Sequence, residues 1–221
     1  MGNRFLEWIA AIARTSRMTG CAKSSACILL LAGSATAVEP GAPPNAFTIT
    51  EKSFHCMTQM TQVGHFYVDN LAGNLQGTVQ LARSGMPGIY PVGSVLQLVP
   101  TEVMVKREKG FNAATRDWEF FELDVSKDGS KIRTRGFVEV NNRFGGNCFG
   151  CHIKARPEWD LVCDINHGCD PIPITRNMTG ALQRTDPRCK NQGPVSAEDA
   201  AALAQLGTIV KAMNAAKAPK Q

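Results

Sequence analysis

The sequence predicts an α+β fold: an antiparallel sheet of about five strands with a few helices. Strand-like apolar runs lie at residues 65–68, 94–99, 103–106, 117–125 and 131–140. Lys127-Asp128-Gly129-Ser130 is a strong turn signal between the last two runs, which therefore form a hairpin. Consecutive strands joined by short turns favour an antiparallel arrangement.

Two segments have helical character. Residues 71–84 place apolar side chains near helical spacing, and Gly85 with Pro87 ends that pattern. A second helix begins at Ser196, where Ser196-Ala197-Glu198-Asp199 forms a capping box with Asp in the Glu position. The Ala-rich stretch that follows is expected to stay helical to about residue 215.

The run at residues 117–125 has the clearest strand pattern. It sets the apolar side chains of Trp118 and Phe120 against the carboxylates of Glu119 and Glu122. This pattern predicts a strand with one apolar and one polar face.

Residues 1–37 have the features of a secretory signal. Three basic residues precede a short apolar run at residues 26–33, and Ala35-Thr36-Ala37 offers a small-residue cleavage site. The alternative is a membrane anchor, but about eight apolar residues cannot span a bilayer, which needs about 20. A lipoprotein attached through Cys21 or Cys27 is the weaker alternative. We therefore expect export to the periplasm, with no membrane span.

The rest of the chain divides into three parts. Residues 38–53 begin with a Pro/Gly-rich stretch and are expected to form a flexible leader. Residues 54–195 form the main domain, and residues 196–221 form the C-terminal helix and tail.

The charge balance argues against a nucleic-acid-binding protein. The formal net charge is +5, but the first 37 residues hold four basic residues and one acid. The remaining chain has 20 basic and 18 acidic residues, a net charge of +2, without a run of like charges. A nucleic-acid binder usually carries a basic stripe.

The chemically informative motif is Cys148-Phe149-Gly150-Cys151-His152, the C-x-x-C-H signature of covalent haem attachment. Two thiols on one helical turn can add to the two vinyl groups of one porphyrin edge, and the next residue then lies under the iron. The motif predicts one haem c with His152 as its iron ligand. The alternatives are a Cys148–Cys151 disulfide beside an incidental histidine, and a thioredoxin-like redox pair, for which no βαβ pattern is present.

The second axial ligand of the iron decides the function. A Met or His ligand gives an electron carrier, whereas an open apolar site gives a gas binder or a catalyst. The sequence does not choose among the candidates, which are His55, His65, His167, Met57, Met60, Met86, Met104 and Met178.

Four further cysteines follow the predicted signal, at positions 56, 163, 169 and 189. In an oxidising compartment they allow three pairings. Cys163–Cys169, which closes a short loop containing Gly168, is our first choice, and it leaves Cys56–Cys189. The alternative is that some of these thiols stay free and buried.

Three blocks around the haem motif resemble the cytochrome P-460 domain. They are Gly93-Ser94-Val95, the run at residues 105–111 (VKREKGF) and Asp117-Trp118-Glu119-Phe120-Phe121, followed by Asn147 and the C-x-x-C-H motif. The resemblance covers residues 65–154 and has a looser tail. It implies a five-stranded antiparallel sheet holding one haem c, with a homodimer as a common assembly. Residues 54–195 would then be the haem domain.

The resemblance also implies site residues. The family's hydroxylamine oxidisers cross-link a lysine to the haem, and that position falls on Leu98, which cannot form the bond. Lys106 lies on the next strand and does not take this role. The family's distal carboxylate corresponds to Glu102, whose alternative role is that of a solvated residue at a strand edge. Leu98 would then form an apolar distal wall above the iron.

The function implied is an exported monohaem cytochrome of the P-460 type. Its relatives, the β-type cytochromes c′, bind NO or CO at a five-coordinate iron. A leucine at the cross-linking position favours binding of small nitrogen oxides, or electron exchange with a redox partner protein. The alternatives are a haem enzyme that oxidises hydroxylamine or NO, and a binding module without haem.

Overall fold

A computed structural model describes residues 47–190 and 193–217 of the chain. The predicted secretory signal at residues 1–37, with Cys21 and Cys27, lies outside the described residues, as does the leader up to residue 46.

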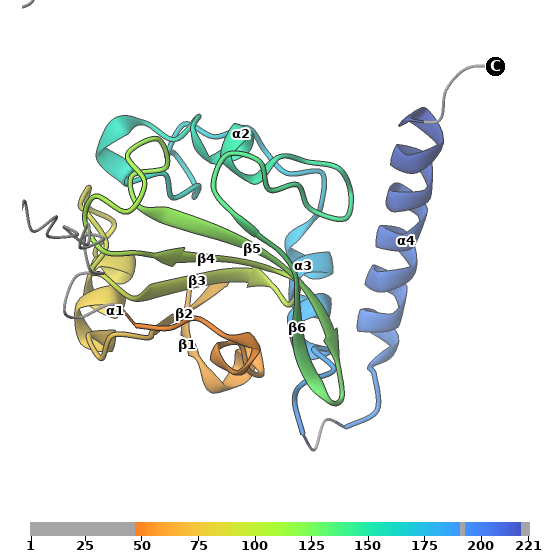
Figure 1. Ribbon diagram of the computed structural model, residues 1–221. Coiled ribbons are helices and arrows are strands. Elements are labelled where there is room, and N and C mark those ends of the chain that lie inside the picture. Colours follow the sequence, from red (N-terminus) through yellow and green to blue (C-terminus); the bar gives the residue numbers. More distant parts are fainter. Residues whose placement is uncertain (1–46, 191–192, 218–221) are drawn as a thin grey trace, which may run out of the picture. The chain divides into compact units, whose positions relative to one another are not determined.

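The fold is α+β, as predicted, with an antiparallel sheet whose six strands follow one another in chain order (Figure 1). All five predicted strands are present. The sixth, β1, has only three residues and pairs through Thr61 with Val68 of β2. The strands are β1 (Thr61–Val63), β2 (Phe66–Asn70), β3 (Ser94–Val99), β4 (Glu102–Lys106), β5 (Trp118–Ser126) and β6 (Gly129–Gly136).

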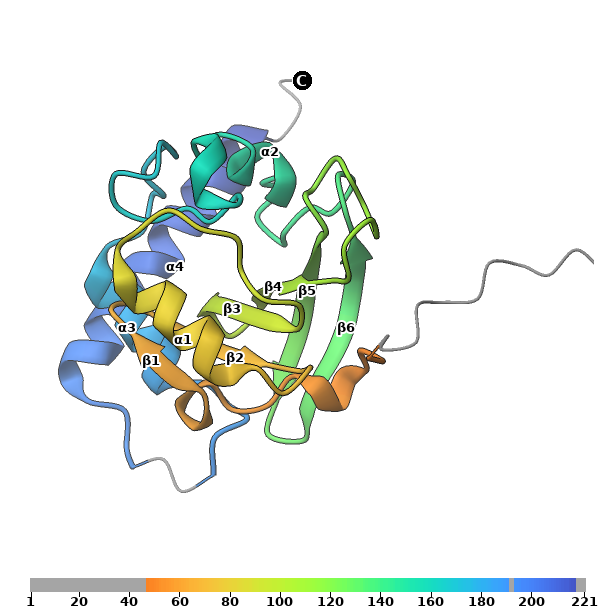
Figure 2. The same cartoon turned by 90° about the vertical axis from the view of Figure 1, so that its left-hand side faces the viewer.

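Four α-helices and three short 3-10 helices accompany the sheet in the described part of the chain (Figure 2). Helix α1 begins after Asn74, whose side chain accepts a hydrogen bond from Gly77 N, and it ends at Gly85 in the left-handed conformation. The helices are α1 (Leu75–Ser84), α2 (Cys148–His152), α3 (Arg176–Arg184) and α4 (Ala197–Lys217), with η1 (Glu51–Ser53), η2 (Met57–Gln59) and η3 (Pro157–Trp159).

Both faces of the sheet are buried. One face packs against α1, α2 and the loop that follows η3, through the core cluster Val63, Val68, Tyr90, Leu96, Met104, Trp118, Phe120, Val140, Leu161 and Val162. The other face holds a second cluster, which contains Ile49, Phe54, Val95, Val103, Val105, Phe121 and Leu123. Both figures show α2 and its flanking loops together on one side of the strands.

The end of the predicted leader belongs to the second cluster. Ile49 is buried there, and its carbonyl oxygen accepts a hydrogen bond from Arg135 on β6. Residues 51–53 form η1, which contacts β6. The packed domain therefore includes Ile49, upstream of the boundary expected at residue 54.

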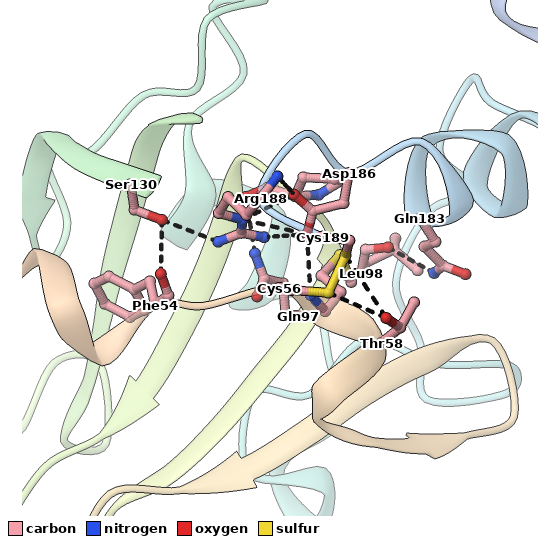
Figure 3. Close-up of polar contacts among 12 residues, drawn as sticks. Phe54, Cys56, Thr58, Gln97, Leu98, Ser130, Gln183, Asp186, Arg188 and Cys189 are labelled. Atoms are coloured by element: carbon pink, nitrogen blue, oxygen red, sulfur yellow. Dashed lines mark hydrogen bonds and ion pairs between the residues drawn. A yellow bond between two sulfur atoms is a disulfide. The ribbon is translucent and has the colours of Figure 1, made fainter. Parts of the chain in front are cut away.

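Both preferred disulfides are present, Cys56–Cys189 and Cys163–Cys169. Cys56–Cys189 joins the segment before β1 to the segment after α3 (Figure 3). Beside it, Asp186 pairs with Arg188 at 2.7 Å and accepts a hydrogen bond from Met57 N at 3.0 Å. Since the bridge spans 133 residues, it restricts the unfolded chain strongly.

Helix α4 packs on α3 through a small third cluster that includes Met178, Ala181 and Ala202. No helix among the described residues is long and apolar enough to cross a bilayer.

A buried ion pair fixes the turn after η3. The Nζ of Lys106, on β4, lies 2.8 and 2.9 Å from the two carboxylate oxygens of Asp160. Tyr90 N also donates to that carboxylate, and Trp118 Nε1 donates to the Asp160 carbonyl. These bonds hold Asp160 and Leu161 at φ values of 50° and 63°, a left-handed conformation that disfavours side chains with a Cβ. The turn therefore depends on the charge of Lys106.

Replacing this lysine should destabilise the protein. Lys106→Met leaves the Asp160 carboxylate, only 3% exposed, without its counter-ion. Losing one partner of such a pair costs about 3–5 kcal/mol in the free energy of unfolding, which denaturant titration would measure. The control is Lys154→Met, whose pair with Asp170 is exposed and which should unfold like wild type. Equal stability of the two variants would contradict the prediction.

Candidate functional site

The C-x-x-C-H motif forms a single short helix, α2. Asn147 caps it, because its side-chain oxygen accepts a hydrogen bond from Gly150 N at 2.6 Å. The Asn147 amide also donates to the carbonyls of Val138 and Val140. The Cys148 N–H donates to Val140 O at 3.0 Å. The loop before α2 therefore binds the first turn of the helix through both the Asn147 side chain and the Cys148 backbone.

The two motif cysteines are the free thiols among the described residues, since the other four described cysteines form disulfides. Cys148 is half-buried and Cys151 is exposed. Burial, together with the nearby carboxylates of Glu102 and Glu122, raises the pKa of the Cys148 thiol to about 12. Cys148 is therefore a neutral thiol at pH 7.

His152 has the geometry of a metal-binding imidazole. Its Nδ1 lies 2.7 Å from the carbonyl oxygen of Leu161, and a carbonyl can only accept, so Nδ1 carries the proton. The lone pair of Nε2 is then available to a metal, as in metal sites where the second ring nitrogen is held by a carbonyl. Burial lowers the pKa of His152 and keeps the ring neutral, which metal binding requires.

Apolar side chains surround this helix. The His152 ring lies against Phe120 of β5 with centroids 5.2 Å apart, and Cys148 and Phe149 pack against the core cluster that contains Met104 and Leu161. Two unpaired thiols, a neutral imidazole with a free Nε2 and an apolar wall are the groups that a covalently attached haem requires. The described residues therefore fit a haem c.

The loop closed by Cys163–Cys169 lies directly against α2. The Cys163 sulfur is 3.8 Å from the Cys151 carbonyl oxygen, and Arg156 N donates to His167 O at 2.7 Å. The His167 ring stacks on Trp159 with centroids 3.7 Å apart. This short disulfide thus restrains the segment that follows the motif.

Glu102 lies close to the motif and has a partner that the sequence analysis did not identify. It is directly opposite Glu122 in the register of β4 and β5. Asn142 donates to Glu102, and Arg143 donates to Glu122 at 2.6 Å. Burial and the charge of Glu122 raise the pKa of Glu102 to about 7. The family's distal role for Glu102 remains a proposal.

Leu98, the other residue assigned by resemblance, is half-buried on β3. Its carbonyl oxygen accepts a hydrogen bond from Gln183 Nε2 of α3 at 2.8 Å, near the Cys56–Cys189 bridge (Figure 3). Leu98 lies at the same end of the sheet as Glu102, because Val99 pairs with Glu102 across the β3–β4 turn. Its role as a distal wall also remains a proposal.

Most candidates for the second axial ligand of the iron contact residues outside α2. His55 faces Asp69 at 3.7 Å, His65 faces Asp164 at 3.6 Å, and His167 bonds to the Val162 carbonyl. Met104 is the candidate in the core cluster against which Cys148 packs. The other methionines lie elsewhere: Met57 is buried beside Asp186, Met60 packs on the opposite sheet face, Met86 is exposed, and Met178 joins the α3–α4 cluster.

Glu122 was wrongly expected on a polar strand face. In the structure Glu122 shares a face with Trp118 and Phe120, because residues two apart on a strand point the same way. Glu119 points to the opposite face, where it pairs with Arg107 and Arg135. The sequence held a signal for this position: Glu122 follows Trp118 and Phe120 at intervals of two residues, which places its carboxylate on their apolar face.

Two other features lie apart from the motif. The sulfurs of Cys56 and Cys189 lie near Asp186, but they are joined in a disulfide and cannot act as thiolate ligands. A shallow groove of about 510 Å³ between α3 and α4 contains no residue of α2 and is lined by Thr175, Arg176, Asn177, Glu198, Ala201, Ala202 and Gln205.

Comparisons of the chain with models of protein families, with curated proteins and with solved structures found no match.

The cysteines of the haem-free protein should fall into two classes according to their reactivity with an alkylating reagent. Alkylation without reduction followed by peptide mapping should label Cys151 first and Cys148 slowly, because Cys148 is half-buried with a raised pKa. Cys163 and Cys169 should stay unlabelled until a reductant is added, which provides the internal control. Recovery of a Cys148–Cys151 disulfide peptide would contradict the predicted free thiols.

Proposed function

We propose that the protein is an exported monohaem c-type cytochrome of the P-460 type. Cys148 and Cys151 would hold the haem covalently, and His152 would bind its iron. The haem would supply a redox-active iron that binds small nitrogen oxides such as NO, exchanges electrons with a partner protein, or does both.

The observation that carries this proposal is the combination of free thiols and an oriented imidazole on one helical turn. Four described cysteines are oxidised in pairs, whereas the two motif cysteines are not. The Leu161 carbonyl accepts the Nδ1 proton of His152, so the lone pair for an iron is on Nε2. The disulfides also agree with an oxidising compartment, which supports export.

The P-460 assignment rests on the motif blocks and on where they lie. The Asp-Trp-Glu-Phe-Phe block supplies Trp118 and Phe120 on β5, and Phe120 contacts His152. The block at residues 105–111 supplies Lys106, which anchors the turn that carries Leu161. Both blocks therefore shape the surroundings of the proposed iron ligand. A homodimer, common in the family, belongs to the same proposal.

Oxidation of hydroxylamine or NO is the second candidate function. The Glu102–Glu122 pair favours it, because such a reaction releases protons and a carboxylate with a pKa near 7 can accept one. Leucine at position 98 counts against it, since the cross-linking lysine of the hydroxylamine oxidisers is absent there.

Covalent haem should depend on the motif. Wild type produced with a haem c maturation system should carry one haem per chain in the pyridine haemochrome assay. Cys151→Ala should lower stable covalent haem at least about tenfold, because the thioether beside His152 is lost. His152→Ala should alter the ferric and ferrous spectra, whereas His55→Ala, whose ring faces Asp69, should leave them unchanged. Full covalent haem in Cys151→Ala would exclude the proposed attachment.

Adding NO should test the iron's second axial site. We expect a ferrous c-type absorption spectrum without the red-shifted Soret band of a lysine cross-link, because Leu98 cannot form one. New bands on adding NO would establish an open site. A ferrous spectrum that NO does not change would indicate a filled site, and the protein would then be an electron carrier.

A further inference from the structure

Two glutamates face each other on the sheet beneath the motif. Glu102 of β4 and Glu122 of β5 are directly opposite in the antiparallel register, where Cβ atoms lie about 4.5–5.5 Å apart. The next pair on the same face is Met104 and Phe120, and Phe120 contacts His152. Like charges in opposed positions repel each other. A pair placed this way is therefore costly if both groups are ionised.

The neighbouring arginines do not offset the burial of this pair, since the pKa of each glutamate is raised. Arg143, on the loop before α2, binds Glu122 at 2.6 Å but also bonds to Asp124 and to the Leu123 carbonyl. Arg133 of β6 is the other cation whose field reaches Glu122, and it too lowers the pKa of that group. The neutral groups facing the pair are the Asn142 amide and the Cys148 thiol. Burial nevertheless raises the pKa of Glu122 above its ordinary value, against the opposing effect of the two arginines. Arg143 also lowers the pKa of Glu102, whose hydrogen-bond donor is the Asn142 amide.

One oxygen of Glu122 lacks a donor. The side chain is 1% exposed, and its Oε2 is buried with no hydrogen-bond partner. An unsatisfied buried carboxylate oxygen is costly. A proton on Glu102, across the strand pair, would supply the missing donor. Burial and the charge of Glu122 raise the pKa of Glu102 to about 7, which agrees with a single proton on the pair near neutral pH.

Both carboxylates lie near the proposed haem edge. Each raises the pKa of the Cys148 thiol, so their fields reach the atom that would form a thioether. A charge added to or removed from a haem at that position would act on the pair through a partly buried region, where electrostatic coupling is stronger than in water.

We propose that Glu102 and Glu122 form a carboxyl pair with one shared proton, which is bound when the haem iron is reduced and released when it is oxidised. This inference rests on the proposed haem c. Reduction from ferric to ferrous iron takes one electron from a donor protein and removes one positive charge. The pair then takes one proton from water and restores the local charge. Oxidation reverses both transfers.

The test is the midpoint potential of the haem-loaded protein, measured by spectroelectrochemistry from about pH 5 to pH 8.5. Because the reduced state binds the proton more tightly, the wild-type potential should fall as pH rises through the titration of the pair. Glu102→Gln should lose this pH-dependent fall near neutrality. Glu122→Gln should move it to lower pH, because Glu102 then lacks the like charge that raises its pKa.

Asp124→Asn is the matched control, because Asp124 also accepts a hydrogen bond from Arg143 but is exposed. It should keep the wild-type pH profile. A Glu102→Gln protein with that same profile, or a wild-type potential that does not change with pH, would overturn the coupling while leaving the haem proposal intact. Absence of covalent haem in the haemochrome assay would overturn both.

A readout independent of the potential is thermal unfolding of the ferrous protein, the state in which the proton is bound. Since the folded-state pKa of Glu102 is raised, the stability that this group contributes is present below its ordinary pKa of 4.5 and is lost as pH rises to about 7. The Tm of Glu102→Gln relative to wild type should therefore increase between about pH 5 and pH 7.5. An unchanged difference in Tm over that range would contradict the shared proton.

Discussion

The ion pair between Lys106 and Asp160 fixes the geometry of the motif. It anchors a left-handed turn, and the residue after Asp160 in that turn is Leu161, whose carbonyl holds His152. Without this anchor, two side-chain-bearing residues would relax toward ordinary backbone conformations. The imidazole would then lose the acceptor that selects its tautomer. An interaction in the sheet core therefore decides which ring nitrogen of His152 carries the proton.

Both faces of the sheet are buried, and each face has a different role. One face stabilises the fold through an apolar cluster and the Arg107–Glu119–Arg135 ion-pair network. The other face carries the groups under α2: an apolar patch around Phe120 and, two residues further along β5, the carboxyl pair. A haem at α2 would thus contact apolar and titratable side chains of the same two strands.

Much of the architecture was predictable from local sequence patterns. The strands, the 127–130 turn and the helix beginning at residue 197 follow from periodicity and capping, whereas α1 begins at Leu75, four residues after the expected start at residue 71. Strand β1 was missed because three residues are too short to show alternation. Helix α3 was missed because a Gly-containing polar segment places few apolar residues at helical spacing, and its buried positions become apparent only against α4 and β3. Glu122 was assigned to the wrong face because the strand was assumed to have one solvated side.

By itself the sequence determined what depends on neighbours in the chain: two thiols and an imidazole within one helical turn, and the short Cys163–Cys169 loop. Only the tertiary structure decided what depends on distant segments. The Leu161 carbonyl at His152, the opposition of Glu102 and Glu122, and the ion pair of Arg143 with Glu122 all require strand register and loop packing. Spacing along a chain does not encode these contacts, because register is set by burial of whole strands.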